Sequence, residues 1–210
     1  MIEIISHRGY WKKGEEKNQA VAFEHSFNLG FGTETDFRDY NGKLVISHDI
    51  ADAYSVNSDE FFGIHAKCNS NLPLAINVKA DGLQTLLKSV LSKFNISNYF
   101  VFDMSVPDAL LYLQHDFVVY SRQSEHEKEP AFYDKCAGIW LDAFVNRWYD
   151  ADLIRAHITH RKKVAIVSFD LHKRDPIPLW QYLKDNRLHE CDDVMLCTDI
   201  PEDALSFFNS

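Results

Sequence analysis

The sequence lacks the features of secreted, membrane-spanning and nucleic-acid-binding proteins. Its start, Met-Ile-Glu-Ile-Ile-Ser, has neither the basic residues nor the apolar run of a secretion signal, so we expect a cytoplasmic protein. No apolar run approaches the length of a bilayer, so we expect no stable membrane insertion. With 22 Lys and Arg against 31 Asp and Glu, the formal net charge is -9. This charge argues against a nucleic-acid partner, because basic surfaces bind phosphate backbones.

Cysteine is scarce and scattered, and a glycine-rich phosphate loop is missing. The four cysteines form no CxxC pair and no spacing typical of zinc sites, which predicts free thiols. The first expected strand leads into HRGYWKKGEEKN rather than into GxGxxG. Linkers, low-complexity tracts and sequence repeats are absent as well. We therefore expect one domain over residues 1–210 with a single core, and leave its oligomeric state open.

What the chain does contain is a regular alternation of apolar, β-rich runs and segments of helical character. This alternation predicts βαβ units and a parallel sheet. Eight strands favour a closed (β/α)8 barrel (a TIM barrel) of the α/β class over an open doubly wound sheet, at the short end of the usual barrel length. The expected strands are 2–6, 33–37, 73–79, 99–104, 117–121, 138–142, 163–168 and 194–198, and the expected helices lie near 18–29, 83–94, 106–114, 126–135, 149–161, 177–187 and 201–208.

The segment 38–72 interrupts this alternation. It contains Asn41-Gly42, a dipeptide typical of hairpin turns, followed by the apolar run Leu44-Val45-Ile46. We interpret the segment as a hairpin excursion over the mouth of the barrel rather than as a separate domain.

Polar side chains stand where the expected strands end, which is the catalytic face of a parallel barrel. Glu34 and Asp36 share one face of their strand, and Asn77 and Lys79 share one face of the next. If that face is the barrel interior, the two carboxylates need a cation, because unpaired buried anions are costly. A hard divalent ion such as Mg2+ or Ca2+ prefers such oxygen ligands. Lys79 adds positive charge for a phosphate.

Each of these features has a structural alternative when it is taken alone. Glu-x-Asp on a strand is more often solvent-facing than metal-binding, and a loop histidine such as His48 ordinarily lies on the surface. Lys79 would then be an edge-strand charge, and Asp142 would cap or brace a helix. Asp199 would belong to the N-cap region of the last helix. Their occurrence together, in order, at strand ends favours a functional site.

The same residues resemble the motifs of the glycerophosphodiester phosphodiesterase family, which implies a (β/α)8 barrel. The hallmark of that family is a split HR, ExD and HD pattern, and its closing motif is TDxP. The matching segments here are His7-Arg8-Gly9, Glu34-Thr35-Asp36, His48-Asp49 and Thr198-Asp199-Ile200-Pro201.

The resemblance also implies roles for single residues. His7 and His48 match the acid–base histidines of the family, and Arg8 matches its phosphate-contacting arginine. Glu34 and Asp36 match two metal ligands.

The chain departs from the family at two places. The third metal ligand of the family is a glutamate in an ExK motif, where this chain has Asn77-Val78-Lys79. The lysine is kept, and the amide oxygen can still coordinate Mg2+ or Ca2+, but it carries no charge. The second departure is Lys17-Asn18-Gln19, where the family commonly has Glu-Asn-Thr.

We therefore expect a metal-dependent phosphodiesterase that acts on a small glycerophosphodiester-like or sugar-phosphodiester substrate. The alternative is a catalytically impaired barrel that binds phosphate or sugar phosphate, as Asn77 suggests. A Schiff-base enzyme using Lys79 would leave the histidines and carboxylates unexplained. The sequence leaves open which alcohols the diester contains and whether the metal is Mg2+ or Ca2+. It also leaves open which histidine is the acid and which the base, and whether the reaction is hydrolysis or cyclisation.

Overall fold

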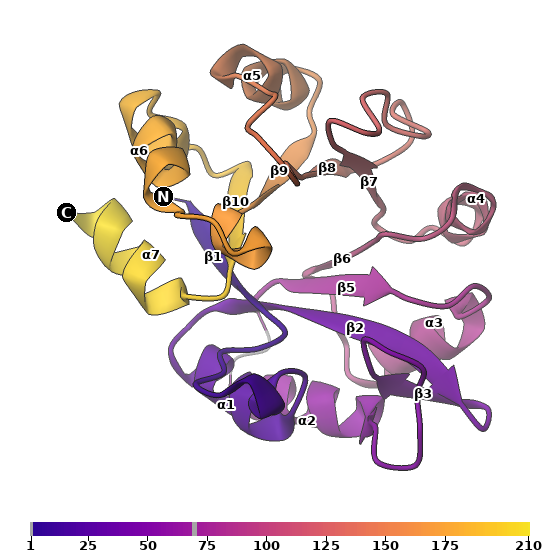
Figure 1. The fold of residues 1–210 in the computed structure, drawn as a ribbon. Coiled ribbons are helices and arrows are strands. Elements are labelled where there is room, and N and C mark those ends of the chain that lie inside the picture. Colours follow the sequence, from indigo (N-terminus) through magenta and orange to yellow (C-terminus); the bar gives the residue numbers. More distant parts are fainter. Residues whose placement is uncertain (1, 69–70) are drawn as a thin grey trace.

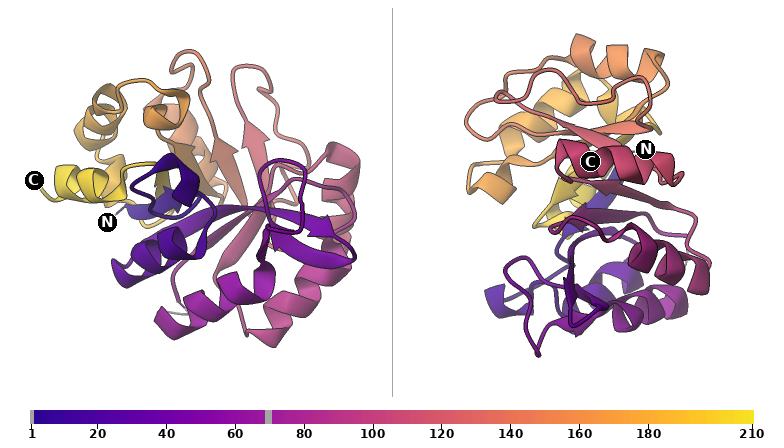
Figure 2. Two further views of the ribbon diagram at one scale, coloured as in Figure 1. Left: turned by 60° about the horizontal axis from the view of Figure 1, so that its bottom comes forward. Right: turned by 90° about the vertical axis from the view of Figure 1, so that its right-hand side faces the viewer.

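The strands lie at the centre of the molecule and the helices surround them (Figures 1 and 2). The computed structural model describes residues 2–68 and 71–210, so positions 69–70 of the predicted segment 38–72 lie outside the described residues. Eight parallel strands follow one another in a curled sheet, in the order β6-β5-β2-β1-β10-β9-β8-β7. Their bounds are β1 Glu3–His7, β2 Gly32–Tyr40, β5 Leu74–Val78, β6 Tyr99–Phe102, β7 Tyr120–Gln123, β8 Gly138–Leu141, β9 Lys163–Val167 and β10 Val194–Thr198.

The two ends of the curled sheet approach each other at β6 and β7. One isolated parallel bridge joins Val101 to Val119, and the backbone N–H of Val101 donates to Val118 O at 2.8 Å. The predicted parallel α/β architecture is thus confirmed as a curled sheet. Within the described residues, this bridge is the backbone pairing that crosses the gap between β6 and β7.

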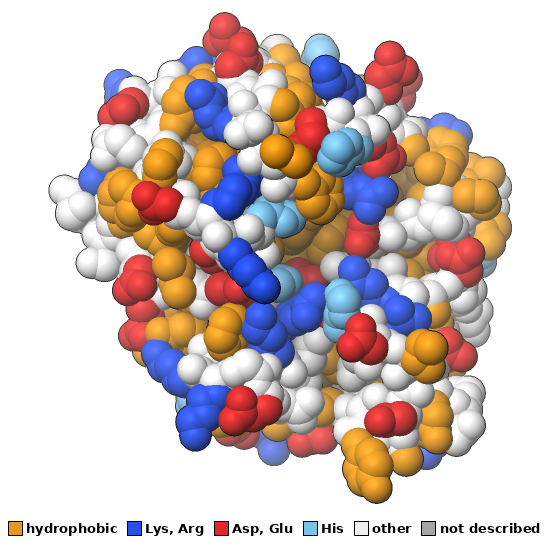
Figure 3. Space-filling view, viewed as in Figure 1, with side chains coloured by type: hydrophobic (Ala, Val, Ile, Leu, Met, Phe, Trp, Pro, Cys, Tyr) orange, Lys and Arg blue, Asp and Glu red, His pale blue; other side chains and the backbone are white. Residues whose placement is uncertain are grey.

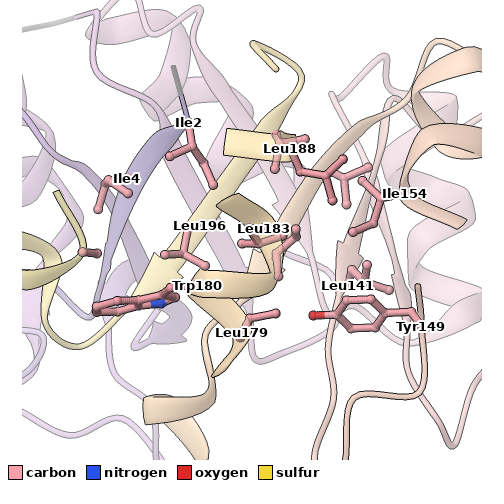
Figure 4. Close-up of a cluster of buried hydrophobic side chains, with 14 of the residues drawn as sticks. Ile2, Ile4, Leu141, Tyr149, Ile154, Leu179, Trp180, Leu183, Leu188 and Leu196 are labelled. Atoms are coloured by element: carbon pink, nitrogen blue, oxygen red, sulfur yellow. The ribbon is translucent and has the colours of Figure 1, made fainter. Parts of the chain in front are cut away.

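Helices pack on the outer face of the sheet through their apolar sides. Trp180 is fully buried between α6 and the sheet, and its Nε1 donates to Ser168 Oγ at 2.9 Å (Figure 4). Elsewhere on the same outer face, Phe23 of α1 packs edge-on against Phe61 of α2, with ring centroids 4.7 Å apart. The helices are α1 Ala20–Asn28, α2 Ser58–Cys68, α3 Gln84–Lys93, α4 Val106–Gln114, α5 Ala151–Thr159, α6 Ile177–Asp185 and α7 Pro201–Asn209.

Aromatic side chains fill the inside of the curl. Phe100 stacks on Tyr120, and Phe102 stacks on Trp140, with ring centroids 3.9 Å apart in both pairs. Ala75 packs in the same cluster, where its small side chain leaves room for these rings. This packing fills the interior, so a substrate can enter only part of the way, at the end of the curl where the parallel strands finish.

The hairpin predicted from Asn41-Gly42 is present. β3 (Lys43–Ile46) runs antiparallel to β2, and a short strand, β4 (Val56–Asn57), pairs with β3. Asn41 and Gly42 have φ of 49° and 74°. Positive φ at both positions is what a two-residue type I′ turn requires.

The interpretation of segment 38–72 as a hairpin alone is wrong, because its second half is the helix α2. Ser58 begins the helix, and Asp59 and Glu60 stand in its first turn. Acidic side chains there interact favourably with the positive end of the helix dipole. The helix therefore belongs to the regular alternation that this segment was expected to interrupt.

Two further predictions need correction. Residues 126–135 form turns rather than a helix, because Pro130 disfavours helical geometry in the residue before it. The side chain of Gln123 instead holds this segment by donating to Lys128 O at 2.8 Å. The strand expected at 117–121 begins at Tyr120 and runs to Gln123. This shift brings Arg122 to the open end of the sheet.

None of the helices in residues 2–68 and 71–210 has the length and apolar character needed to span a membrane. All four cysteines are free thiols.

Candidate active site

A cavity of about 390 Å³ opens at the carboxyl ends of the parallel strands. Figure 3 shows this face of the molecule, with Lys, Arg and His side chains gathered around a central hollow. Asp36 lies behind the cavity wall, fully buried. The other predicted site residues all line the cavity, namely His7, Arg8, Glu34, His48, Asn77 and Lys79.

The His-Arg-Gly motif forms a tight turn after β1. Arg8 and Gly9 have φ of 59° and 79°, in the left-handed region that glycine tolerates best. A Cβ at Gly9 would lie 2.8 Å from the backbone carbon of Ala22 in α1, so only glycine fits. The N–H of Arg8 donates to Glu34 O at 2.8 Å. These contacts fix the backbone that carries His7 and Arg8.

His7 is held by a carboxylate from the other end of the chain. Its Nδ1 lies 2.7 Å from Asp199 Oδ1, and its Nε2 lies 3.9 Å from Glu34 Oε2. Asp199 is itself fixed, because its backbone N–H donates to Asp170 Oδ2 at 2.6 Å. The N-cap of α7 is Ile200. Asp199 therefore orients His7 and does not cap the helix.

His48 reaches the same cavity from the loop that follows β3. Its Nδ1 lies 2.9 Å from Asp49 Oδ1, and its carbonyl accepts from the Arg38 guanidinium at 3.1 and 3.3 Å. The side chain is 44% exposed. Like His7, His48 has its Nδ1 beside a carboxylate, which leaves Nε2 available to a substrate.

Glu34 and Asp36 lie side by side in the interior, as predicted. Their side chains are each about 1% exposed. Glu34 accepts from Asn77 Nδ2 at 3.0 Å and from the Arg8 N–H at 3.2 Å. Burial, and next the charge of Asp36, raise the pKa of Glu34 above its ordinary value. The pair thus favours a nearby cation or a proton.

Two cations already flank Asp36. Arg8 Nε lies 3.1 Å and Lys79 Nζ lies 3.6 Å from its carboxylate oxygens. Asn18 Nδ2 donates to the same carboxylate at 2.8 Å. Lys79 Nζ also donates to Asp103 at 3.0 Å, and Asp103 in turn pairs with Arg122. Asp36 therefore holds two positive side chains at the base of the cavity.

The oxygen atoms of Glu34, Asp36 and Asn77 are the donors that a hard cation would use. No three His, Cys, Asp or Glu side chains form such a site in the part of the chain that the structure describes, so the set depends on the Asn77 amide. Asp36 and Asn77 are neighbours in the β2–β5 register, and each has a buried Oδ1 without a hydrogen-bond partner, although Lys79 Nζ lies 3.6 Å from that of Asp36. Because buried polar atoms are normally paired, these two oxygens fit a divalent ion.

The opposite wall of the cavity carries residues that the motifs did not predict. His172 Nε2 lies 2.7 Å from Asp142 Oδ1, which also accepts from the Ala143 N–H at 2.7 Å. The structural alternative, in which Asp142 caps the following helix, does not hold, because the N-cap of α5 is Asp150, whose side chain accepts from Leu153 N. Asp142 and His172 are 30 residues apart, so sequence spacing gave no signal of their pairing.

The fold is that of solved glycerophosphodiester phosphodiesterases. No protein-family model matches the sequence, and no curated protein matches it. Among solved structures, a candidate glycerophosphodiester phosphodiesterase from Galdieria sulphuraria has a TM-score of 0.78 at 16% identity, over 100% of this chain and 98% of that chain. A glycerophosphodiester phosphodiesterase from Agrobacterium tumefaciens has a TM-score of 0.68 at 14% identity, over 100% of both chains.

A third structure is a phosphodiesterase from Oleispira antarctica in complex with its product sn-glycerol-3-phosphate. It has a TM-score of 0.71 at 14% identity, over 99% of this chain and 97% of that chain. The resemblance that the motifs indicated is thus confirmed at the level of the fold.

Proposed function

We propose that the protein is a metal-dependent phosphodiesterase that cleaves a small glycerophosphodiester-like or sugar-phosphodiester substrate. The observation that carries this proposal is the meeting of His7 and His48 with Arg8 and Lys79 around one cavity. We also propose that the curled sheet closes into a full (β/α)8 barrel, and that residues 1–210 form one domain.

Arg8 and Lys79 bind the phosphate. Asp36 holds both side chains, so their charges are oriented before the substrate arrives. Preorganised cations stabilise the charge that builds on the non-bridging oxygens during phosphoryl transfer. The ion pairs of Lys79 with Asp36 and Asp103 suit this role better than that of a free amine nucleophile.

His7 and His48 transfer the protons. One Nε2 takes a proton from the nucleophile, which is water or a neighbouring hydroxyl of the substrate, as the new P–O bond forms. The other Nε2 gives a proton to the leaving alkoxide as the old P–O bond breaks. Positioned groups of this kind contribute about 100-fold or more in rate. Asp199 and Asp49 keep the two rings in place.

Glu34, Asp36 and Asn77 would hold the divalent metal, Mg2+ or Ca2+. When bound, such an ion supplies Lewis-acid stabilisation of a phosphate oxygen. Burial, and next the charge of Asp36, raise the pKa of Glu34, and a bound cation would offset both effects.

A second candidate function is the binding of phosphate or sugar phosphate without turnover. It is favoured by the hydrogen bond from Asn77 Nδ2 to Glu34, which satisfies one carboxylate oxygen without a metal. A panel of phosphodiesters tested with Mg2+, with Ca2+ and after chelation separates the two functions. Metal-dependent release of an alcohol that His7→Ala abolishes supports the enzyme. Calorimetric binding of sn-glycerol-3-phosphate without cleavage of any diester supports the binding protein.

A further inference from the structure

A second cavity, of about 370 Å³, adjoins the candidate active site. Arg8 and His48 line both cavities, so the two spaces meet at these side chains. We call the second cavity the outer groove. Its walls come from the segment after β1 and the loop after β3, and include Gly14, Lys17, Gln19, Ser47, Asp52 and Tyr54.

A phosphodiester carries one alcohol on each side of its phosphorus. Because Arg8 and His48 stand where the two cavities meet, we propose that the phosphate lies between them and that the outer groove binds one of the two alcohols. This inference rests on the proposed function. It adds a binding site that the motif residues do not include.

The walls of the outer groove select a hydroxylated alcohol. Apart from Ile46 and Tyr54, its lining side chains are polar or charged, or absent as in Gly14. The far wall of the first cavity instead carries Phe144, Val167 and Leu171. An acyl chain in the outer groove would leave polar groups without partners, which costs binding free energy. A polyol such as glycerol or inositol would satisfy them.

Residues on both walls of the outer groove make contacts within the protein. The ammonium of Lys17 lies 4.2 Å from the centre of the Trp11 ring and 4.0 Å from Asp199 Oδ2. On the other wall, Asp52 Oδ1 accepts from the Tyr54 N–H at 2.8 Å and so closes a tight turn. Lys17 also belongs to the stretch Lys17-Asn18-Gln19, at which the sequence departs from the family pattern. Its three N–H donors point to hydroxyl recognition at this departure.

Gly14 allows the groove to be filled without disturbing the fold. A Cβ added there meets no atom within 4 Å, and the residue needs no positive φ. We would therefore make Gly14→Trp and measure kcat/KM on three methyl phosphodiesters whose second alcohol is methanol, glycerol or inositol. The indole should lower kcat/KM for the glycerol and inositol diesters by about 10-fold or more, the usual effect of a lost alcohol pocket. The methanol diester should change little.

Gly63→Trp is the matched control. A Cβ at Gly63 also meets no atom within 4 Å, and this residue of α2 lines neither cavity. It should leave all three diesters unaffected. Lys17→Met is a second variant, in case Gly14→Trp does not fold. It should raise KM for the glycerol and inositol diesters relative to the methanol diester.

The results distinguish this inference from the proposed function. One outcome is an active enzyme with the same ratios of kcat/KM among the three diesters in wild type, Gly14→Trp and Lys17→Met. That result would contradict alcohol binding in the outer groove but not the proposed phosphodiesterase activity. A uniform loss on all three diesters would do the same. A wild type that cleaves no diester would reject both proposals.

Discussion

Nδ1 of His7 lies 2.7 Å from Oδ1 of Asp199, although 192 residues separate them in the sequence. The contact joins the end of β1 to the residue after β10, strands that are parallel neighbours in the sheet. A carboxylate at Nδ1 keeps the proton there and leaves Nε2 as the end that exchanges protons. Asp199 therefore positions His7.

Asp199→Asn tests this relationship. The amide is nearly the same size, but it can turn an N–H toward Nδ1 and so favour the wrong tautomer. We expect kcat to fall about 100-fold or more, with KM changed much less. Asp142→Asn is the comparison, because it alters the His172 pair on the far wall in the same way. An equal loss of kcat in both variants would contradict a special role for Asp199.

His7→Ala and His48→Ala should each lower kcat by about 100-fold or more, the usual worth of a positioned acid or base. Neither side chain belongs to a hydrophobic core cluster, so the melting temperatures should stay close to that of the wild type. Steady-state kinetics and thermal melts check both points. Normal turnover in His48→Ala would mean that this half-exposed histidine is only a surface residue.

Much of the fold and of the candidate site could be predicted because the relevant signals are local. Side chains of a strand alternate between its two faces, which placed Glu34 and Asp36 on one face and Asn77 and Lys79 on one face of the next strand. In the structure all four side chains lie in or directly behind one cavity. The dipeptide Asn41-Gly42 identified a hairpin for an equally local reason, its tolerance of positive φ.

The parts that could not be predicted depend on contacts between distant segments. The pairing of His172 with Asp142 on one wall of the cavity depends on where β8 and β9 end in the curled sheet, which no local pattern encodes. The helix expected at 126–135 is replaced by turns that side chains of other segments hold. One of these contacts joins the Tyr133 hydroxyl to His157 Nδ1 in α5 at 2.8 Å.

Asn77 should control metal affinity. Asn77→Glu replaces a neutral ligand by a carboxylate and removes the hydrogen bond that Asn77 donates to Glu34, so three buried carboxylates would then need a cation. We expect tighter binding of Mg2+ or Ca2+ in a calorimetric titration, and a lower melting temperature after chelation. Asn77→Ala should weaken metal binding. Identical affinity in wild type and both variants would remove Asn77 from the ligand set.

Chelation gives the corresponding test on the unmodified protein. Exhaustive treatment with EDTA should abolish diester cleavage, and added Mg2+ or Ca2+ should restore it, because the proposed metal would stabilise charge on the phosphate. Full activity after chelation would mean that Arg8 and Lys79 alone balance the buried carboxylates.

His157 ties α5 to the irregular segment between β7 and β8, and this link should depend on pH. Its Nε2 lies 2.9 Å from Gln123 Oε1, which can only accept, so Nε2 carries the proton and Nδ1 accepts from the Tyr133 hydroxyl. The same hydroxyl lies 3.1 Å from His160 Nδ1. Burial, and next the nearby His160, lower the pKa of His157 to about 4. In the folded protein the His157 ring is therefore neutral at pH 7.

Because the folded pKa of His157 lies below the unfolded value of about 6.5, the unfolded chain takes up a proton first as the pH falls. The contribution of His157 to stability should therefore be complete above about pH 6.5 and decline toward pH 4, by at most about 1.4 kcal/mol per pH unit. Urea unfolding at several pH values would measure this contribution.

His157→Gln should be less stable at pH 7, by about 1–3 kcal/mol for the lost buried hydrogen bonds, but its stability should change less between pH 6.5 and 4. His160→Gln, altered at the exposed end of the network, should keep most of the wild-type slope. If His157→Gln and the wild type lose stability in parallel over this range, the slope comes from other groups and His157 is not the titrating residue.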